Sequence, residues 1–232
     1  MRQPADITPL TYLDYPRKAA CILWFSGCNL RCPYCYNPDL ATARRDSSQD
    51  VLAFLRERQG FLDAVVLSGG ESTLNPDIRE LCREIKALGY AVKVDTNGSN
   101  PDVLAGLLRD GLLDYVAIDN KMPSARSWKV PGGDRLFDRF SLSLGHLLAS
   151  GIDFEVRTTV HPDLLDEGDI LQMIREPRDL GYRGTYYLQF FFDTGNTLGH
   201  LPPPSRRYDR GLLVDRSPLP IGYRNLPADL ST

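Results

Sequence analysis

The sequence predicts an α/β fold, an incomplete (β/α)6 partial TIM-type barrel with parallel strands. Six short apolar runs alternate with helix signals along the chain, and polar motifs follow most of the runs. Alternation of strands and helices indicates a parallel sheet with right-handed crossovers. Six such units fall short of the eight that close a full barrel, so this barrel should be open.

Each expected strand is a short apolar run. The first, at 19–25, is continuously apolar, which is typical of a strand buried on both faces. The others are expected at 63–68, 91–95, 113–119, 154–160 and 185–192. Cys21 lies within the first strand and Cys82 within a helix, and both are expected to be core residues.

The expected helices have recognisable ends. Asparagine before proline supplies a capping side chain and a first helical residue, and glycine commonly follows the last turn. The start signals are Ser47 or Ser48, Asn75-Pro76 and Asn100-Pro101, and the stops are Gly60, Gly89, Gly111 and Gly151. The helices should cover 47–58, 76–88, 101–110, 136–150 and 169–176, the last ending before Pro177.

The composition excludes several classes of protein. A formal net charge of -3 gives no overall attraction to phosphate backbones, so no nucleic-acid partner is expected. Five cysteines, three of them clustered, do not form the framework of a secreted disulfide-rich protein. The chain shows no apolar signal-peptide run and no membrane-length apolar stretch, so a cytoplasmic location without membrane attachment is expected.

The clustered cysteines are Cys28, Cys32 and Cys35, spaced C-x3-C-x2-C directly after the first strand. A 4Fe-4S cluster normally takes four thiolates, so three would leave one iron open to a small molecule. Structural zinc bound by these cysteines and a distant histidine is the alternative. Zinc sites usually pair two C-x2-C units or add a nearby histidine pair, whereas the histidines here are His146, His161 and His200.

Polar motifs follow the other strands. They are Ser68-Gly-Gly-Glu71, Asp95-Thr-Asn-Gly98, Asp119-Asn-Lys121 and Gln189. Parallel α/β folds build their sites at the carboxyl ends of strands, so these groups should meet beside the cysteines. An ordinary turn is the competing explanation for any one motif.

The spacing C-x3-C-x-aromatic-C, with Tyr34 as the aromatic residue, resembles the cluster loop of radical S-adenosylmethionine enzymes. The resemblance implies two cofactors, a 4Fe-4S cluster and S-adenosylmethionine, which the reduced cluster cleaves to methionine and a 5'-deoxyadenosyl radical. Gly69-Gly70-Glu71 resembles the motif that holds the methionine amino group. That motif usually continues with proline, where this chain has Ser72.

Individual roles follow as expectations. Gly69 and Gly70 permit close backbone approach, and Glu71 offers a carboxylate to an ammonium group. Asp95 and Thr96 are candidates for a ribose hydroxyl, the methionyl group or a cation.

Lys121 and Arg157 are candidates for neutralising a carboxylate, with a mutual salt-bridge network as the alternative. Tyr34 is expected to pack against adenine or shield the cluster. Gln189 completes the expected cofactor-binding set.

A narrower resemblance involves motifs in seven places. They lie at 13–16, 27–38, 68–71, 95–101, 114–119, 157–160 and 187–189, and together resemble anaerobic ribonucleoside-triphosphate reductase-activating proteins. This resemblance implies that the radical takes a hydrogen atom from a backbone glycine of a partner, the large subunit of an anaerobic ribonucleotide reductase. An electron donor such as flavodoxin or ferredoxin is implied, and no side chain needs to act as an acid or base.

Other functions remain open at this point. The nearest is an activator of another glycyl-radical enzyme, such as pyruvate formate-lyase, followed by a radical enzyme with a small-molecule substrate. A non-catalytic iron-sulfur electron carrier and a zinc-stabilised binding module are alternatives from other classes. The expected organisation is a lead-in at 1–18, the barrel at 19–200, and a tail at 201–232 that docks on a partner or is partly disordered.

Overall fold

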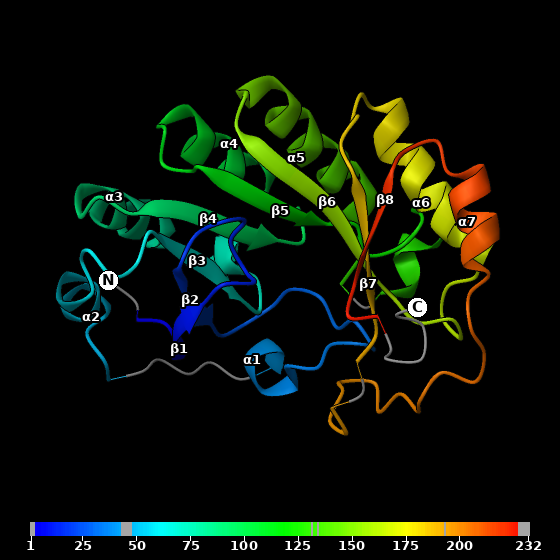
Figure 1. Cartoon of the computed structure of the whole chain (residues 1–232), viewed down its shortest axis with the longest axis horizontal. Helices are drawn as coiled ribbons and strands as arrows, with labels where there is room; N and C mark the ends of the chain where they lie inside the picture. Colours follow the sequence, from blue (N-terminus) through cyan, green and yellow to red (C-terminus); the bar gives the residue numbers. More distant parts are fainter. Residues whose placement is uncertain (1–2, 43–47, 131, 134, 193, 227–232) are drawn as a thin grey trace.

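The computed structural model describes residues 3–42, 48–130, 132–133, 135–192 and 194–226. One eight-stranded sheet runs through it in the order β1 to β8 (Figure 1). The strands are β1 Asp6–Thr11, β2 Ala20–Phe25, β3 Ala64–Gly69, β4 Ala91–Thr96, β5 Tyr115–Asp119, β6 Asp153–Val160, β7 Tyr186–Phe190 and β8 Ile221–Arg224. All neighbours from β2 to β8 pair in parallel, which confirms the predicted α/β barrel architecture.

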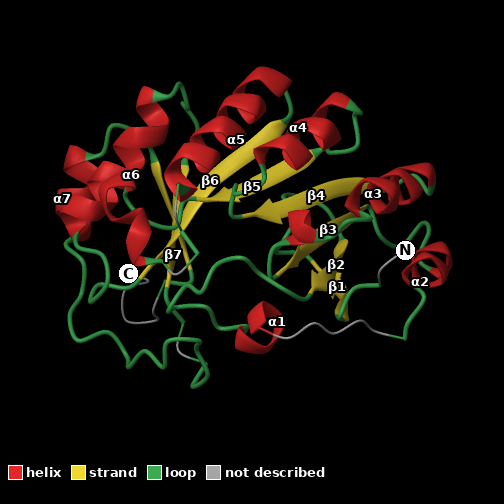
Figure 2. Cartoon of the chain, turned by 180° about the vertical axis from the view of Figure 1, so that it is seen from behind, coloured by secondary structure: helices red, strands yellow, loops and turns green. Residues whose placement is uncertain are grey.

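Helices alternate with the parallel strands and cover the outer side of the curved sheet. Figure 2 shows α2 to α7 arranged along this side. The helices are α1 Pro38–Thr42, α2 Val51–Glu57, α3 Ile78–Ala87, α4 Pro101–Arg109, α5 Leu136–Ser150, α6 Glu167–Asp179 and α7 Arg210–Arg216. Within the described ranges, no helix has the length and apolar character needed to cross a membrane.

The main hydrophobic core lies between the sheet and these helices. Helix α3 buries Ile78, Leu81, Cys82 and Ile85, a spacing that places all four on one helical face. Cys21 belongs to the same core, so both cysteines are core residues, as predicted. Burial of this face fixes the helical layer and thereby the strand ends.

Among the residues that the structure describes, a small apolar cluster on the inner face of the sheet is formed by Ala20, Ile22, Ala64, Val66 and Tyr15. Tyr15 comes from the β1–β2 connection and packs against the Tyr115 ring, with 5.7 Å between ring centroids. Because this cluster occupies only part of the inner face, the remainder can hold polar side chains.

Two strands extend the predicted set of six. β1 comes from the predicted lead-in, was not among the six expected strands, and pairs antiparallel with β2. Its Pro9 is tolerated because β1 is an edge strand and the register shifts between Thr8 and Thr11. β8 pairs with β7 and comes from the predicted tail, of which residues 227–232 lie outside the described chain.

Three helix starts differ from the prediction, and α6 begins at Glu167 rather than Asp169 because Asp166 caps it. Asp50 caps α2 by accepting hydrogen bonds from Leu52 N and Ala53 N, and Ser47 lies outside the described residues. α3 begins at Ile78 rather than Pro76, because Asn75 Oδ1 accepts from Asp77 N in a turn before the helix. α4 begins at Pro101 as predicted.

Helix α6 continues through Pro177, where the sequence predicted its end. Proline at this position removes the donor that would satisfy the carbonyl of Met173, four residues earlier. The side-chain amide of Asn120 donates to Met173 O at 3.2 Å instead. A polar side chain from the loop after β5 therefore lets the helix extend past its proline.

Replacing Asn120 with Ala should lower the free energy of unfolding by about 1–3 kcal/mol, because a buried carbonyl loses its donor. Urea denaturation monitored by circular dichroism measures the change. Adding Pro177→Ala restores a backbone donor to Met173 O, so the double variant should recover part of the loss. If Asn120→Ala lowered the free energy of unfolding equally with and without Pro177→Ala, this explanation of the long helix would be contradicted.

Candidate active site

The residues predicted to form the site line one cavity at the carboxyl ends of the strands. This cavity opens to solvent. All twelve predicted residues are among its lining: Cys28, Cys32, Cys35, Tyr34, Gly69, Gly70, Glu71, Asp95, Thr96, Lys121, Arg157 and Gln189. The structure thus brings together groups from six strand ends.

The cysteine loop leaves β2 and is anchored near α1. Gly27 N donates to Leu40 O at 2.6 Å, and Cys28 N donates to Ala41 O at 3.2 Å. The sulfur of Cys28 accepts from Leu30 N at 3.4 Å and from the Asn97 amide at 4.0 Å. Burial raises the pKa of the Cys28 thiol to about 11, so metal binding at this residue must release a proton.

The three thiols are free and share the pocket, which suits a cluster held by three cysteines. In the described part of the chain, no three Cys, His, Asp or Glu side chains converge on a point that could hold a single metal ion. A four-iron cluster does not need its ligands to converge on one point, because each thiolate binds a different iron. N–H donors directed at Cys28 also suit a sulfur ligand, since such donors tune iron-sulfur sites.

Gly69 and Gly70 bring the end of β3 against the start of the cysteine loop. A Cβ at Gly69 would lie 2.3 Å from Phe25 O, and one at Gly70 would lie 2.1 Å from Gly27 O. Gly69 also has φ of 117°, which favours glycine. Both glycines are therefore required by backbone packing beside the cysteines, whether or not a ligand is present.

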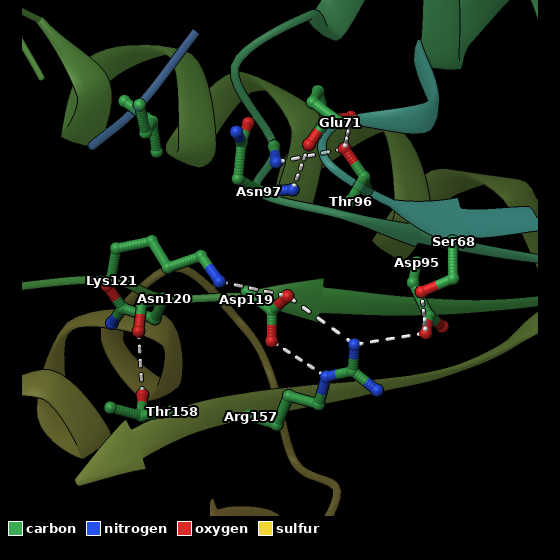
Figure 3. A network of polar contacts seen from close by, with 12 residues as sticks. Ser68, Glu71, Asp95, Thr96, Asn97, Asp119, Asn120, Lys121, Arg157 and Thr158 are labelled. Carbon is green, nitrogen blue, oxygen red and sulfur yellow. Dashed lines mark hydrogen bonds and ion pairs between the residues drawn. The ribbon is translucent and has the colours of Figure 1, made fainter. Parts of the chain in front are cut away.

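Glu71 is 2% exposed and its carboxylate is held by protein donors. Oε1 accepts from Thr73 Oγ1 at 2.5 Å. It also accepts from Thr96 Oγ1 at 2.7 Å, and Oε2 accepts from Asn97 N at 2.7 Å (Figure 3). Burial raises the pKa of Glu71, and these donors partly oppose that rise. The side chain therefore ties the loop after β3 to the loop after β4.

Ser72 stands where related motifs have proline. Its side chain is fully buried, and Oγ donates to the backbone carbonyl of Asp95 at 2.9 Å. The hydroxyl therefore adds a second link from this loop to β4, which a proline side chain cannot make.

Arg157 lies between two carboxylates from neighbouring strands (Figure 3). Its guanidinium contacts Asp119 at 2.7 Å and Asp95 at 3.2 Å. Burial raises the pKa of Asp95, but Arg157 and Lys93 outweigh that effect and lower it to about 2. The predicted alternative of a salt-bridge network is therefore present, and it forms one wall of the pocket.

The network continues at both ends. Lys121 Nζ lies 3.2 Å from Asp119, and Lys93 Nζ lies 3.0 Å from Asp95. Tyr34 is buried and its hydroxyl donates to Lys121 O at 3.2 Å, which joins the cysteine loop to the end of β5. Tyr34 thus has a structural partner besides any ligand.

Several pocket residues were absent from the predicted binding set. They include Asp14, Asn97, Asp119 and Thr159. Thr159 follows Arg157 by two positions on β6, so alternation along the strand would have indicated its inward direction. Asp14 lies in the β1–β2 connection and not in a strand, so no alternation indicated its direction. This connection folds back, and Asp14 O accepts a hydrogen bond from Lys93 Nζ at 2.5 Å.

The chain is similar to known proteins of one family. The model of the radical SAM superfamily matches residues 22–175. A Methanocaldococcus jannaschii protein named "Putative glycyl-radical enzyme activating enzyme" is 33% identical over 75% of this chain and 75% of its own length. Pyruvate formate-lyase-activating enzyme of Clostridium pasteurianum is 29% identical over 66% of each chain.

A solved structure shows the same fold. Streptococcus suis SuiB, in a crystal structure bound to its precursor peptide SuiA, has a TM-score of 0.64 and 14% identity. The match covers 87% of this chain but only 48% of SuiB, so this chain spans about half the length of that protein.

The fold and pocket define an α/β-barrel enzyme with its site at the carboxyl ends of the strands. The chain belongs to the radical SAM superfamily. Its cofactors are accordingly a 4Fe-4S cluster and S-adenosylmethionine. This membership argues against the electron-carrier and zinc-module alternatives.

Proposed function

We propose that the chain is an activating enzyme that generates a glycyl radical on a partner enzyme. The observation that carries the proposal is the three-cysteine loop inside a pocket shared with polar residues from five other strand ends. The M. jannaschii relative supports the choice of reaction, because its name specifies glycyl-radical activation and the match spans three quarters of both chains.

In this proposal, Cys28, Cys32 and Cys35 hold the cluster. When bound, the cluster would supply the electron for reductive cleavage of S-adenosylmethionine, the chemistry needed to remove a hydrogen atom from a glycine of the partner. Asn97 and Leu30 direct N–H groups at Cys28 and stabilise it as a ligand. The Gly69-Gly70 backbone sets the distance between the cysteine loop and β3.

The charged wall of the pocket would bind the zwitterionic part of S-adenosylmethionine. Lys121 and Arg157 provide positive charge for a carboxylate, while Asp95 and Asp119 provide negative charge for an ammonium or ribose hydroxyl. All four are already paired, so they are preorganised and need little rearrangement on binding. No proton transfer by a side chain is required.

Glu71→Gln should retain the cluster but weaken S-adenosylmethionine binding by about tenfold, comparable to the loss of a buried charge-assisted hydrogen bond. In the variant, an NH2 donor replaces one of the two oxygens that accept hydrogen bonds in Glu71. The described partners of Glu71, including Asn97 N, are all donors, so one of them would face another donor. The loops after β3 and β4 should therefore separate slightly. Equilibrium dialysis with the reconstituted protein measures affinity, and unchanged binding would contradict a positioning role for Glu71.

The proposed partner is the large subunit of an anaerobic ribonucleotide reductase, with flavodoxin or ferredoxin as electron donor. In the described chain, β1 and β8 are unjoined edges of the sheet, so the barrel is open to a partner's loop. The similarity to the Clostridium pasteurianum enzyme favours a second candidate, activation of a pyruvate formate-lyase. The cytoplasmic location stays a prediction from the sequence.

Electron paramagnetic resonance distinguishes these partners. The reduced protein and S-adenosylmethionine are incubated anaerobically with purified reductase or with pyruvate formate-lyase. A glycyl-radical signal in the reductase alone is expected. A signal only in pyruvate formate-lyase would transfer the assignment to the second candidate, and no signal in either would overturn both partner assignments.

A further inference from the structure

The segment 197–200 lies along the second half of the cysteine loop, although the two are far apart in sequence. Leu198 N donates to Cys35 O at 2.8 Å, and Gly199 N donates to Pro33 O at 2.9 Å. These bonds hold the backbone at and beside a predicted cluster ligand. The segment also lies beyond residues 22–175, which match the superfamily model.

Gly199 is required for this contact. A Cβ built there would lie 2.7 Å from Pro33 Cβ, 2.8 Å from Pro33 Cα and 2.9 Å from Pro33 O. Such distances are too short for any side chain, so the cysteine loop or the segment would have to move. Gly199 has no positive φ, which makes the reason steric contact rather than backbone conformation.

The segment forms a hydrogen-bonded turn and is anchored just beyond its C-terminal end. Thr197 is 3% exposed; its carbonyl accepts from His200 N at 3.0 Å, and its hydroxyl accepts from Leu201 N at 2.9 Å. Just beyond it, Pro202 O lies 3.1 Å from Nε2 of His161, a residue buried after β6. The segment is therefore a fixed support and not a loosely attached strand.

We propose that residues 197–200 form a clamp that positions Cys35 for cluster binding. The inference rests on the proposed function for the cluster, but the clamp itself is a property of the protein without cofactor. Cys28 is held independently by the α1 contacts and by Asn97. Cys35 N donates to Cys32 O at 3.0 Å within the cysteine loop, and its hydrogen bond from outside the loop comes from Leu198 N. Loosening the clamp should therefore affect Cys35 more than Cys28.

Site-resolved alkylation of the cluster-free protein tests the clamp. Iodoacetamide labelling, followed by peptide mass spectrometry, gives a rate for each cysteine. In Gly199→Ala, Cys35 should react about tenfold faster, an effect of the size expected from losing one or two hydrogen bonds, while Cys28 changes little. The matched control is Gly145→Ala, because Gly145 lies in α5 with nothing within 4 Å of an added Cβ.

His161→Phe provides a milder second variant in case Gly199→Ala does not fold. It keeps an aromatic ring beside Phe191 but removes the contact to Pro202 O. A smaller acceleration at Cys35 is expected, with an unfolding midpoint close to that of the wild-type protein. Folded variants that label Cys35 at the wild-type rate would overturn the clamp.

A second readout uses the reconstituted protein. Iron release to a chelator should be several-fold faster in Gly199→Ala than in Gly145→Ala. If the wild-type protein took up no iron-sulfur cluster, the proposed function would fail while the alkylation result still stood. Normal loading with identical iron release in both variants would overturn the clamp and leave the proposed function intact.

Discussion

Replacing Cys32 with Ala is expected to abolish both cluster assembly and cleavage of S-adenosylmethionine. Cys32 is buried in the pocket and is the middle of the three thiols. Loss of a residue that hydrogen-bonds to a metal ligand lowers metal affinity or activity by about 10–100-fold. Loss of a direct ligand should therefore lower them more. Iron analysis and chromatography of 5'-deoxyadenosine measure the two effects.

Cys82→Ala is the matched control for this substitution. Cys82 is also fully buried, but it lies in α3 within the hydrophobic core, away from the pocket. This variant should keep its iron and its activity, with only a modest loss of stability. Cleavage retained by Cys32→Ala, or lost equally in both variants, would contradict the assignment of the cluster ligands.

Arg157→Met should lower the free energy of unfolding by about 3–5 kcal/mol, because it leaves Asp95 and Asp119 without their shared buried partner. Arg157 contacts both carboxylates, and its side chain is 12% exposed. Urea denaturation at neutral pH measures the loss. The control is Arg83→Met, which removes an exposed ion pair with Glu80 in α3 and should cost less than about 1 kcal/mol.

The same variant should alter the acid side of the stability profile. In the wild-type protein, the pKa of Asp95 is lowered from 3.8 to about 2. The stabilisation from ionised Asp95 is therefore present above about pH 4 and is lost as the pH falls toward 2. Without Arg157, the pKa of Asp95 should rise toward that of the unfolded chain, so the stability lost between about pH 4 and pH 2 should become smaller. Identical profiles for the two proteins would contradict the network.

The parallel core of the fold could be predicted because its signals are local. Apolar runs located β2 to β7, and Gly151 marked the end of α5. β8 could not be predicted, because four residues after a proline give no periodicity and are stabilised by pairing with β7. The length of α6 depends on Asn120, a residue distant in sequence, so Pro177 alone gave the wrong end.

The site could be predicted as a set of residues but not as a set of contacts. Strand ends placed Glu71, Asp95, Lys121 and Arg157 in one pocket, as expected. The sequence could not show that Glu71 is occupied by Thr73, Thr96 and Asn97, since those bonds require the β3 and β4 loops to meet. Sequence position gives the face of a strand, whereas tertiary packing determines the partner.

Anaerobic formation of 5'-deoxyadenosine is the most direct test of the central claim, that the three-cysteine pocket performs radical S-adenosylmethionine chemistry. The protein is reconstituted with iron and sulfide, reduced with dithionite and mixed with S-adenosylmethionine. The expected result is 5'-deoxyadenosine together with the spectrum of a 4Fe-4S cluster. Zinc in place of iron and no product, while a control enzyme is reconstituted successfully, would contradict it.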